Sequence, residues 1–500
     1  MIKTSFQYHH HTSYDRHKMT SHYLDWQNQP VVYKDYPGID PVLLPQDLRI
    51  QEKKLSHLLR DMETSSMAHE IDVEKLSLIL HLTYSLTAKT PYSRGDLYYR
   101  STASAGALYP TEIYVATHGV HGLEDGLLHF ALHHHGLSTI RTQELSHYIV
   151  RFTKTPDQKI PILTFFLTAI LFRSAWKYRD RSYRYHLLDT GHVAENLILA
   201  MKALQLRFHL SYDFDDSKVN YLLGLNEGKE IALAVACVLG PDSVSNLKEE
   251  DVDRLPEDIR NASRVAENEI DYPVIKEIHG ASSQISSKRD YESSMIHELG
   301  LNSNSWEKIL PPDPWPEVMN YPEAVFNRRS RRNFVKQAIP SPYIMALLDS
   351  LCLIENTDYQ QTICIGFLAS HIEDLASGFY LLDTDMNSMG LVAPGSFVER
   401  MAHVCLDQVW LSNAAIHFLF LGNLELLDRT WGMRGYRYAM MTAGRLGERL
   451  YIAATAMGLG CCGIGAFYDP EAVELLGLNN ASRLLYLVAV GRVKNVIGLK

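Results

Sequence analysis

Cysteine is scarce in this sequence, and apolar runs long enough to cross a membrane are missing from it. The cysteines among the 500 residues have neither the density of a disulfide framework nor the spacing of a zinc site, which favours reduced thiols in a cytosol. They are Cys237, Cys352, Cys364, Cys405, Cys461 and Cys462. The chain starts without an apolar signal core, and its longest apolar run, at 160–172, is too short to span a bilayer. We therefore expect a cytoplasmic protein, with this run as a buried strand or helix.

An excess of positive charge is also missing. Lys and Arg total 48 against 58 Asp and Glu, so the formal net charge is -10. Nucleic acids and anionic membranes attract clustered Lys and Arg, and neither is expected as the main partner. The chain is 46% hydrophobic and 21% charged, which is typical of globular proteins, and 500 residues exceed what one core usually fills. Two domains are the natural expectation.

An internal repeat divides the chain into two halves. The stretch "YRYHLLDTGHVAENL" begins at Tyr183 and "YRYAMMTAGRLGERL" begins at Tyr436, an offset of 436 - 183 = 253. The same offset carries "LLGL" at 222–225 onto "LLGL" at 475–478. Each half is predicted to contain a long helix around "YRY", a loop, a short helix that ends in "LLGL", and a closing buried strand.

We predict an α+β fold of two tandem domains that form a pseudo-dimer. The expected boundaries are an N-terminal arm at 1–60, a first domain at 61–245, a connector at 246–315 and a second domain at 316–500. Pro and Gly in the arm indicate an extended segment, and its aromatics suggest that it is docked. The connector is rich in charge, Ser and Asn, so we expect some helix and a flexible centre.

The halves differ at three segments. With the offset of 253, "RRSRR" at 328–332 falls opposite 75–79, where the first half has no arginine. "GLGCCGIGAF" at 458–467 falls opposite a segment without its four glycines. Conversely, "ASAGALYP" at 103–110 has a Ser-Ala-Gly turn that the second half lacks. The complementary losses predict one composite site between the halves.

These segments suit the binding of a flat, phosphorylated ligand. Arg329, Ser330 and Arg332 could converge on one phosphate, although a surface-exposed basic segment would have the same sequence. The glycines would let backbone approach a flat ligand, and the small-residue loop would do the same, but ordinary turns also explain both.

The same segments resemble those of known flavoenzymes. "RRSRRNF", "GLGCCGIGAF" and the "GR" at 491–492 resemble the flavin-binding segments of the nitroreductase superfamily. "RSTASAGALYPTEIYV" and "WKYRDRSYRYHLLDTGHVAENL" resemble the SagB-type FMN-dependent dehydrogenases, the branch that includes azoline oxidases of peptide natural-product pathways. Nearly the whole chain is covered by the resemblance, the connector excepted.

The resemblance implies FMN as the cofactor and assigns roles to particular residues. Family members usually bind it at a homodimer interface, which here would be the boundary between the halves. The implied cofactor-binding residues are Arg328, Arg329, Ser330, Arg332, Ser104, Ala105, Gly106, Ala107, Gly463, Ile464, Gly465 and Arg492. A catalytic pair that deprotonates the substrate carbon is implied at Lys177 and Tyr178. The second half has no lysine at the matching position, so one active site per chain is expected.

A metal site is not expected. Histidine triplets occur at 9–11 and 133–135, but adjacent histidines cannot share one face of a helix or strand, and no further ligand pattern completes a set. His192, on the long helix, is interpreted as a packed histidine and not as a catalytic one. The adjacent Cys461 and Cys462 are interpreted as small core residues.

The leading hypothesis is an FMN-dependent dehydrogenase or oxidase that moves hydride between a small-molecule or peptide-derived substrate and the flavin. The alternatives are an NAD(P)H-dependent reductase of nitro or quinone compounds, and a flavin-free binding protein without catalytic activity. The sequence names neither the substrate nor the electron acceptor. A fused pair could act as a monomer or as a weak homo-oligomer.

Overall fold

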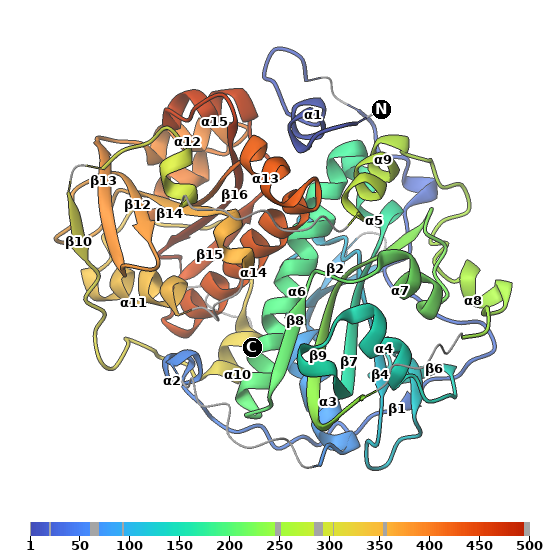
Figure 1. Cartoon of the computed structure of the whole chain (residues 1–500). Coiled ribbons are helices and arrows are strands. Elements are labelled where there is room, and N and C mark those ends of the chain that lie inside the picture. Colours follow the sequence, from blue (N-terminus) through green and yellow to red (C-terminus); the bar gives the residue numbers. More distant parts are fainter. Residues whose placement is uncertain are drawn as a thin grey trace. The chain divides into compact units, whose positions relative to one another are not determined.

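A computed structural model describes residues 2–19, 22–60, 70–92, 95–245, 252–284, 294–303, 305–353 and 358–494. The chain divides into two compact units (Figure 1). The N-terminal unit comprises 23–51 and 61–279, and the C-terminal unit comprises 1–22, 52–60 and 280–500. We describe each unit by itself.

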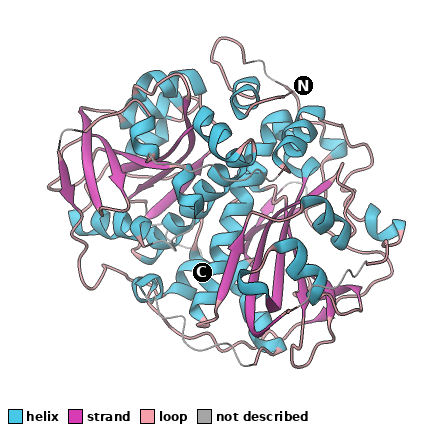
Figure 2. Ribbon diagram, in the orientation of Figure 1, coloured by secondary structure: helices cyan, strands magenta, loops and turns pink. Residues whose placement is uncertain are grey.

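The N-terminal unit is built on a seven-stranded sheet in the order β1-β6-β5-β4-β7-β9-β8, antiparallel throughout (Figure 2, magenta). The strands are β1 (Val42–Leu43), β4 (Thr111–Thr117), β5 (Gly126–Ala131), β6 (Gly136–Arg141), β7 (Lys159–Ile170), β8 (Phe208–Ser211) and β9 (Glu230–Ser243). A separate hairpin joins β2 (Leu86–Tyr92) to β3 (Gly95–Arg100). The apolar run at 160–172 is therefore mainly strand β7.

The C-terminal unit has a sheet of the same size and order, β10-β13-β12-β11-β14-β16-β15, also antiparallel. Its strands are β10 (Trp306–Lys308), β11 (Cys364–Ala369), β12 (Gly378–Asp383), β13 (Ser388–Pro394), β14 (Ile416–Asn423), β15 (Gly460–Ile464) and β16 (Ser482–Gly491). The predicted α+β fold of two tandem domains is confirmed, because the strand orders match position by position.

The helices after the central strand follow the repeat in the same way. α5 (Leu171–Tyr178) and α13 (Leu424–Trp431) lie 253 residues apart at both ends, and so do α7 (Asp216–Leu223) and α15 (Asp469–Leu476). The predicted long helices are α6 (Ser182–Ala203) and α14 (Arg434–Ala456), each buried along almost its whole length. The "LLGL" motifs end α7 and α15 because Gly224 and Gly477 adopt left-handed backbone angles, with φ of 67° and 65°.

The remaining helices cover the sheets or belong to the arm and the connector. They are α1 (Ser5–His11), α2 (Leu55–Arg60), α3 (Val73–Thr83), α4 (Ser146–Thr153), α8 (Glu257–Asn261), α9 (Pro273–Ser282), α10 (Tyr321–Asn327), α11 (Ser341–Cys352) and α12 (Val398–Val404). No helix in the described ranges is long and apolar enough to cross a membrane. The N-terminal arm thus includes a helix, α1, where an extended segment was predicted.

The arm and the connector each add an edge strand to a sheet. β1 pairs with β6 through Val42 and Leu43, and β10 pairs with β13 through 306–308. The core of the N-terminal unit lies where α4 and α7 cover β4, β7 and β9, with Tyr114, Phe166 and Leu223 fully buried. Burial of each such side chain stabilises the fold by about 2 kcal/mol.

The repeat changes register before the first sheet strand. A bridge joins Asp72, just before α3, to His121 after β4, and a matching bridge joins Ile339, just before α11, to Ile372 after β11. The counterpart of α3 is therefore α11, at an offset of 339 - 72 = 267, and not the arginine segment. The alignment of 328–332 with 75–79 was wrong. The matching positions are 61–65, which lie outside the described residues.

Candidate functional site

The arginine segment, here called the arginine loop (328–335), begins where α10 ends. A capping box between Asn320 and Glu323 fixes the start of α10, and Arg328 caps its end. The Arg331 N–H then donates to the Cys461 carbonyl at 2.8 Å, and the Val335 N–H donates to the Arg492 carbonyl at 2.9 Å. The loop is thereby attached to β15 and to the residue after β16. The structure brings the arginines, the glycine segment and Arg492 together within the C-terminal unit.

The arginines of the loop have different surroundings. Arg328 is buried, with its Nε 3.7 Å from a Glu448 carboxylate oxygen and its guanidinium 5.3 Å from the centre of the Tyr451 ring. Arg329 is half-buried and donates to the carbonyls of Phe326 and Arg328. Arg332 is exposed and hydrogen-bonds the Cys462 thiol. Arg328 is therefore held by α14, whereas Arg332 is accessible to a ligand.

Tyr451 of α14 links the arginine loop to the glycine segment. Its hydroxyl accepts a hydrogen bond from the Gly463 N–H at 2.6 Å and lies 2.9 Å from Ser330 Oγ. Burial holds the pKa of Tyr451 well above its ordinary value, so the phenol keeps its proton at neutral pH. Because the oxygen accepts from Gly463, its proton is available for Ser330. This bond orients an exposed serine beside Arg329 and Arg332.

Arg492 follows β16 and is half-buried. Its guanidinium lies 5.4 Å from the centre of the Tyr343 ring, within cation–π range. Its Nε is buried and has no hydrogen-bond partner within the described part of the chain. An unsatisfied donor on a charged group is costly, and an anionic ligand at this position would satisfy it.

The glycine segment forms an edge strand, β15, and is not a loop. It pairs with β16 from Gly460↔Gly491 to Ile464↔Leu487. A Cβ on Gly463 would lie 1.8 Å from Tyr486 Oη, and one on Gly460 would lie 2.1 Å from Val493 Cγ1. Packing inside the unit therefore requires these two glycines, whether or not a ligand approaches their backbone.

The small-residue loop of the N-terminal unit is a tight turn held by α6. Ser104 Oγ donates to Asp189 Oδ2 at 2.6 Å, and the Ala105 N–H donates to Asp189 Oδ1 at 3.1 Å. Gly106 and Ala107 have positive φ of 66° and 54°. The buried Asp189 carboxylate thus fixes a turn whose other side, at Gly106, has no side chain.

Lys177 and Tyr178, at the end of α5, lie against this turn. A Cβ on Gly106 would be 2.6 Å from Tyr178 Oη and 3.1 Å from Lys177 Nζ. Both side chains are half-buried, and Lys177 Nζ lies 5.3 Å from the centre of the Tyr178 ring. An amine and a phenol therefore meet at the small-residue loop, where one could move a proton and the other could orient a substrate.

Three contributors to these arrangements were not predicted from the sequence. Tyr451, Glu448 and Asp189 all lie on the long helices, Tyr451 one residue after the aligned segment and the other two within it. The repeat places Ile198 opposite Tyr451 and Thr442 opposite Asp189, so both positions differ between the halves. The differences at these two positions could have indicated their roles. Glu448 aligns with Glu195 in the repeat, so the sequence comparison showed no difference there.

The two adjacent cysteines are inert in this structure. Burial raises the pKa of Cys462 to about 11 and that of Cys461 well above its ordinary value. Both thiols therefore stay protonated at neutral pH, which agrees with their interpretation as small core residues.

The histidine triplets have separate surroundings. Buried His9 hydrogen-bonds the Tyr436 hydroxyl at 3.1 Å and lies 3.2 Å from Asp469. His133 and His134 lie in the β5–β6 turn, and their ring centres are 3.9 Å apart. Together with Asp35 they form a group that could hold a metal ion. The argument against a metal at this triplet assumed a helix or a strand, whereas His133 and His134 lie in a turn.

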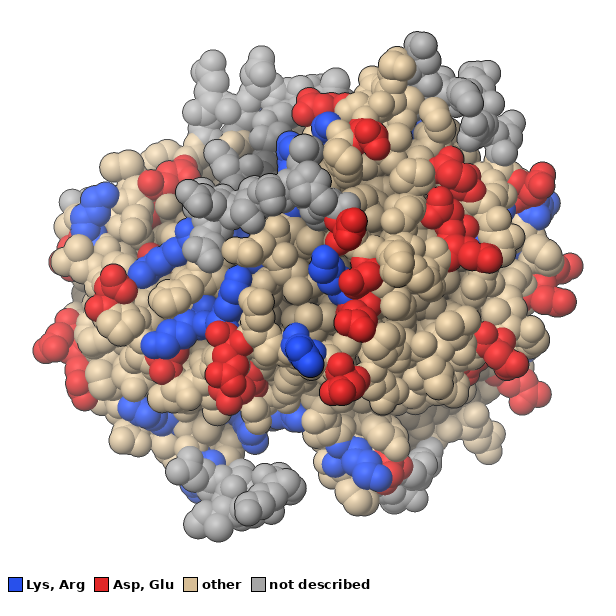
Figure 3. Space-filling model, turned by 90° about the horizontal axis from the view of Figure 1, so that it is seen from below, with Lys and Arg blue, Asp and Glu red and all other residues tan. Residues whose placement is uncertain are grey.

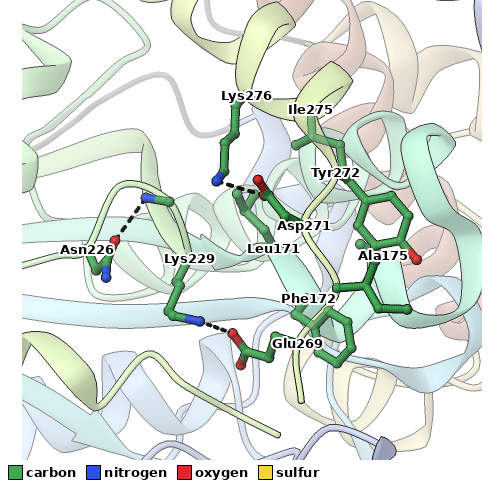
Figure 4. A pocket seen from close by; sticks show the side chains of 12 residues that line it. Leu171, Phe172, Ala175, Asn226, Lys229, Glu269, Asp271, Tyr272, Ile275 and Lys276 are labelled. Carbon is green, nitrogen blue, oxygen red and sulfur yellow. Dashed lines mark hydrogen bonds and ion pairs between the residues drawn. The ribbon is translucent and has the colours of Figure 1, made fainter. Parts of the chain in front are cut away.

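A pocket of about 390 Å³ lies beside the first two turns of α5 (Figure 4). Leu171, Phe172 and Ala175 line it from α5, and its other lining residues come from the loop at 226–229 and the connector segment 269–276. Its charged groups pair with one another, Lys229 with Glu269 and Lys276 with Asp271. Among the described residues that line it, none belongs to the predicted cofactor or catalytic set.

The surface charge agrees with the composition. Both signs occur across the face shown in Figure 3, with uncharged areas between them. A continuous basic surface does not cover this face of the described residues.

Comparison with known proteins gives a consistent set of relatives. The model of the nitroreductase family matches residues 49–240 and 325–492. A putative nitroreductase of Methanocaldococcus jannaschii is 32% identical over 115 residues, which cover 23% of this chain and 57% of that protein. A trifolitoxin-processing protein of Rhizobium leguminosarum bv. trifolii is 29% identical over 187 residues, which cover 35% of this chain and 49% of that protein. The chain thus spans about half the length of these curated relatives.

One solved structure matches almost the whole chain. It is a putative nitroreductase from Anabaena variabilis, with a TM-score of 0.78 and 26% sequence identity. The match covers 99% of this chain and 100% of the other. The tandem arrangement of two such domains is therefore shared with a known protein.

Proposed function

Because the chain belongs to the nitroreductase family, whose members are flavin oxidoreductases, we propose that it is an FMN-dependent dehydrogenase of the SagB type. Its substrate would be a small molecule or a peptide-derived heterocycle. The likeness to a trifolitoxin-processing protein supports the peptide-derived class. The observation that carries the proposal is the meeting of Lys177 and Tyr178 at Gly106.

The C-terminal unit offers a set of donors that fits the FMN phosphate. Arg492 has a buried Nε without a hydrogen-bond partner in the described ranges, which is the group that an anion would satisfy. Exposed Arg332 and the oriented hydroxyl of Ser330 lie in the loop attached beside it. Arg329 adds a second guanidinium. Arg328, buried against Glu448, would position the loop without contacting the phosphate.

The remaining predicted contacts come from both halves of the sequence repeat. Backbone at Gly463, Ile464 and Gly465 would face the ring of the cofactor, and the turn at 104–107 would supply the other side. This cross-half arrangement is proposed from the complementary losses in the sequence. Bound FMN would supply a two-electron acceptor for hydride from the substrate carbon.

Lys177 and Tyr178 would supply the acid–base chemistry. A neutral Lys177 amine would take the proton from one of the two atoms that become doubly bonded, and hydride would leave the carbon at the other end of that bond. The Tyr178 phenol would donate a hydrogen bond that orients the substrate. Gly106 leaves room for both groups, because a side chain there would overlap Tyr178 Oη. The half-buried setting keeps part of the water away from the amine.

The test is substrate oxidation by Lys177→Ala, with Lys218→Ala as a control at an exposed lysine of the same unit. The probe is a synthetic thiazoline-containing peptide, and the readout is the anaerobic loss of flavin absorbance near 450 nm. General-base catalysis contributes about 100-fold to 10,000-fold, so Lys177→Ala should slow bleaching at least about 100-fold while Lys218→Ala keeps the normal rate.

Three results would overturn the proposal. Equal bleaching rates in Lys177→Ala and the unchanged chain would remove the lysine from the mechanism. Bleaching of the unchanged chain by NADPH that an added quinone reverses, without bleaching by thiazoline peptides, would favour a nitro or quinone reductase. A chain that binds no flavin would favour the binding-protein alternative.

A further inference from the structure

The β5–β6 turn holds two exposed or half-exposed imidazoles in a fixed backbone. The His134 N–H donates to the Ala131 carbonyl and the His135 N–H donates to the Leu132 carbonyl, each at 3.1 Å. His135 adopts a positive φ of 48°, which closes the turn before Gly136. His135 is occupied elsewhere, because its Nε2 lies 2.8 Å from Ser77 Oγ. His133 and His134 remain on the outer side of the turn.

A carboxylate from the arm is held next to these imidazoles. Asp35 lies between two buried residues that fix its backbone. On one side, Lys34 Nζ contacts Glu230 and Tyr114 at 2.5 Å each, and on the other, the Tyr36 hydroxyl lies 2.9 Å from that of Tyr114. Asp35 itself is exposed, and its Oδ1 is 3.4 Å from His133 Nε2. The carboxylate is therefore anchored through its neighbours and points outward.

His133 is also oriented by an aromatic contact. The Tyr33 ring stacks on the His133 imidazole, with centres 4.7 Å apart and planes 28° from parallel. This contact leaves the Nε2 edge directed at Asp35. Asp35 is thus positioned through its neighbours in the chain, and His133 through ring stacking. The carboxylate and Nε2 are not used in these contacts.

We propose that Asp35, His133 and His134 form a binding site for a divalent transition-metal ion such as Zn²⁺. One potential ligand atom from each residue lies within 4.8 Å of the others. In a tetrahedral site with bonds of about 2.1 Å, ligand atoms are roughly 3.4 Å apart. The separation of Asp35 and His133 already matches this value, at 3.4 Å. The exposed His134 imidazole is the third ligand, and small side-chain rotations would bring the three ligand atoms to these distances.

The donor set selects the class of metal. Two imidazole nitrogens and one carboxylate oxygen suit Zn²⁺, Cu²⁺ or Ni²⁺, whereas Mg²⁺ and Ca²⁺ prefer oxygen ligands alone. Three protein ligands leave at least one position for water. The site belongs to a surface turn and an arm segment of the N-terminal unit and shares no residue with the set proposed to hold FMN.

The bound ion would crosslink the N-terminal arm to the β5–β6 turn of the sheet. Asp35 lies in the segment that precedes edge strand β1, and the histidines lie in the turn that precedes β6, the partner of β1. A shared metal would join segments almost 100 residues apart along the chain, since 133 - 35 = 98. Binding only to the folded state raises the melting temperature in proportion to the logarithm of metal concentration.

The experiment is a Zn²⁺ titration of the full chain by isothermal calorimetry, with a double variant and a matched control. His133→Ala/His134→Ala removes both imidazoles from the turn. His10→Ala/His11→Ala removes an adjacent, exposed pair on helix α1, where neighbouring side chains diverge. We expect about one Zn²⁺ per chain with micromolar affinity, lost in the first variant by at least tenfold in Kd and kept in the second.

Asp35→Asn provides a second test in case the double variant misfolds. The Asp35 side chain is exposed, and asparagine has the same shape, so this variant should fold normally. It should weaken Zn²⁺ binding several-fold and leave the melting temperature without metal unchanged. Equal Zn²⁺ affinity in the unchanged chain, His133→Ala/His134→Ala and Asp35→Asn would overturn the proposal. So would a titration that Mg²⁺ saturates as readily as Zn²⁺.

Discussion

At the scale of single residues, Gly106 joins backbone strain to the proposed chemistry. Its φ of +66° disfavours any side chain, and an added Cβ would overlap Tyr178 Oη at 2.6 Å. Gly119 has the same φ of +66° in the same unit, but its added Cβ would meet nothing within 4 Å. The two glycines therefore separate backbone strain from the effect of displacing Tyr178.

We expect Gly106→Ala to cost more than Gly119→Ala in both stability and activity. The left-handed backbone alone costs about 1–2 kcal/mol for an alanine, and this cost applies to both variants. The overlap with Tyr178 should add about 1–3 kcal/mol at Gly106 and should slow substrate oxidation, because the phenol and Lys177 must move. Urea unfolding and anaerobic flavin bleaching measure the two effects. Equal stability and equal rates in the two variants would refute the placement of Tyr178.

At the scale of elements, a buried ionic cluster joins β4, β5 and α5 in the N-terminal unit. Glu112 of β4 accepts from Arg173 of α5 at 2.5 Å and lies 2.8 Å from His129 Nε2 of β5. Burial opposes the charge on Glu112, but Arg173 and His129 outweigh it and lower the pKa to about 2 from 4.5. Because α5 also carries Lys177, this cluster anchors the helix of the proposed catalytic pair.

The lowered pKa predicts a loss of stability in acid. A carboxylate with a depressed folded-state pKa stabilises the fold above its unfolded pKa, and the contribution is lost as the pH falls from about 4.5 to about 2. The contribution at neutral pH is about 3 kcal/mol. Hydrogen exchange of peptides from β4, corrected for intrinsic rates, should show this decline. The decline should be smaller in Glu112→Gln and unchanged in Glu124→Gln, an exposed control; a Glu112→Gln curve parallel to that of the unchanged chain would count against it.

The sequence predicted the elements well after the first strand and poorly before it. Helices α5 and α13 keep the offset of 253, because insertions are absent between them and the "YRY" helices. The shift to 267 at α3 coincides with the β2–β3 hairpin, which adds residues 86–100 between α3 and β4 in one half. A linear offset cannot reveal such an insertion where the two halves share few residues. The tandem α+β fold was predictable because its long helices and closing strands retain their apolar patterns.

The sequence predicted the segments of the candidate site but not the residues that hold those segments in place. The arginine loop and Arg492 were quoted from the sequence, yet Tyr451, which links Ser330 to Gly463, acts through contacts 121 and 12 residues away. Contacts at such separations leave no local pattern. The glycines of β15 were recognised in the sequence, but the reason for them was not. Only the structure reveals that Tyr486 and Val493 fill the space where side chains at Gly463 and Gly460 would lie.

At the scale of the whole molecule, the asymmetry of the halves predicts one FMN per chain. The corrected register places the arginine loop opposite residues 61–68, and the sequence from 61 to 70 contains no Lys or Arg. The first half therefore lacks the phosphate-binding residues in either alignment. Released flavin, identified by mass spectrometry and compared with protein concentration, should approach one FMN per chain. Two per chain would contradict the single composite site.

The same measurement tests the arginine loop. Arg329→Ala/Arg332→Ala removes two charge-assisted hydrogen-bond donors worth about 1.5–3 kcal/mol each, which corresponds to at least a 100-fold weaker Kd for FMN. Lys75→Ala removes an exposed positive charge at the start of α3, where Lys75 Nζ donates to the Glu70 carbonyl at 2.7 Å, and should retain the full flavin content. Equal flavin content in all three proteins would exclude the arginine loop as the phosphate site. The double variant alone should lose flavin, and its melting temperature should equal that of the unchanged chain without flavin. That result would show that the positive charges at 329 and 332 bind the cofactor and do not contribute to folding.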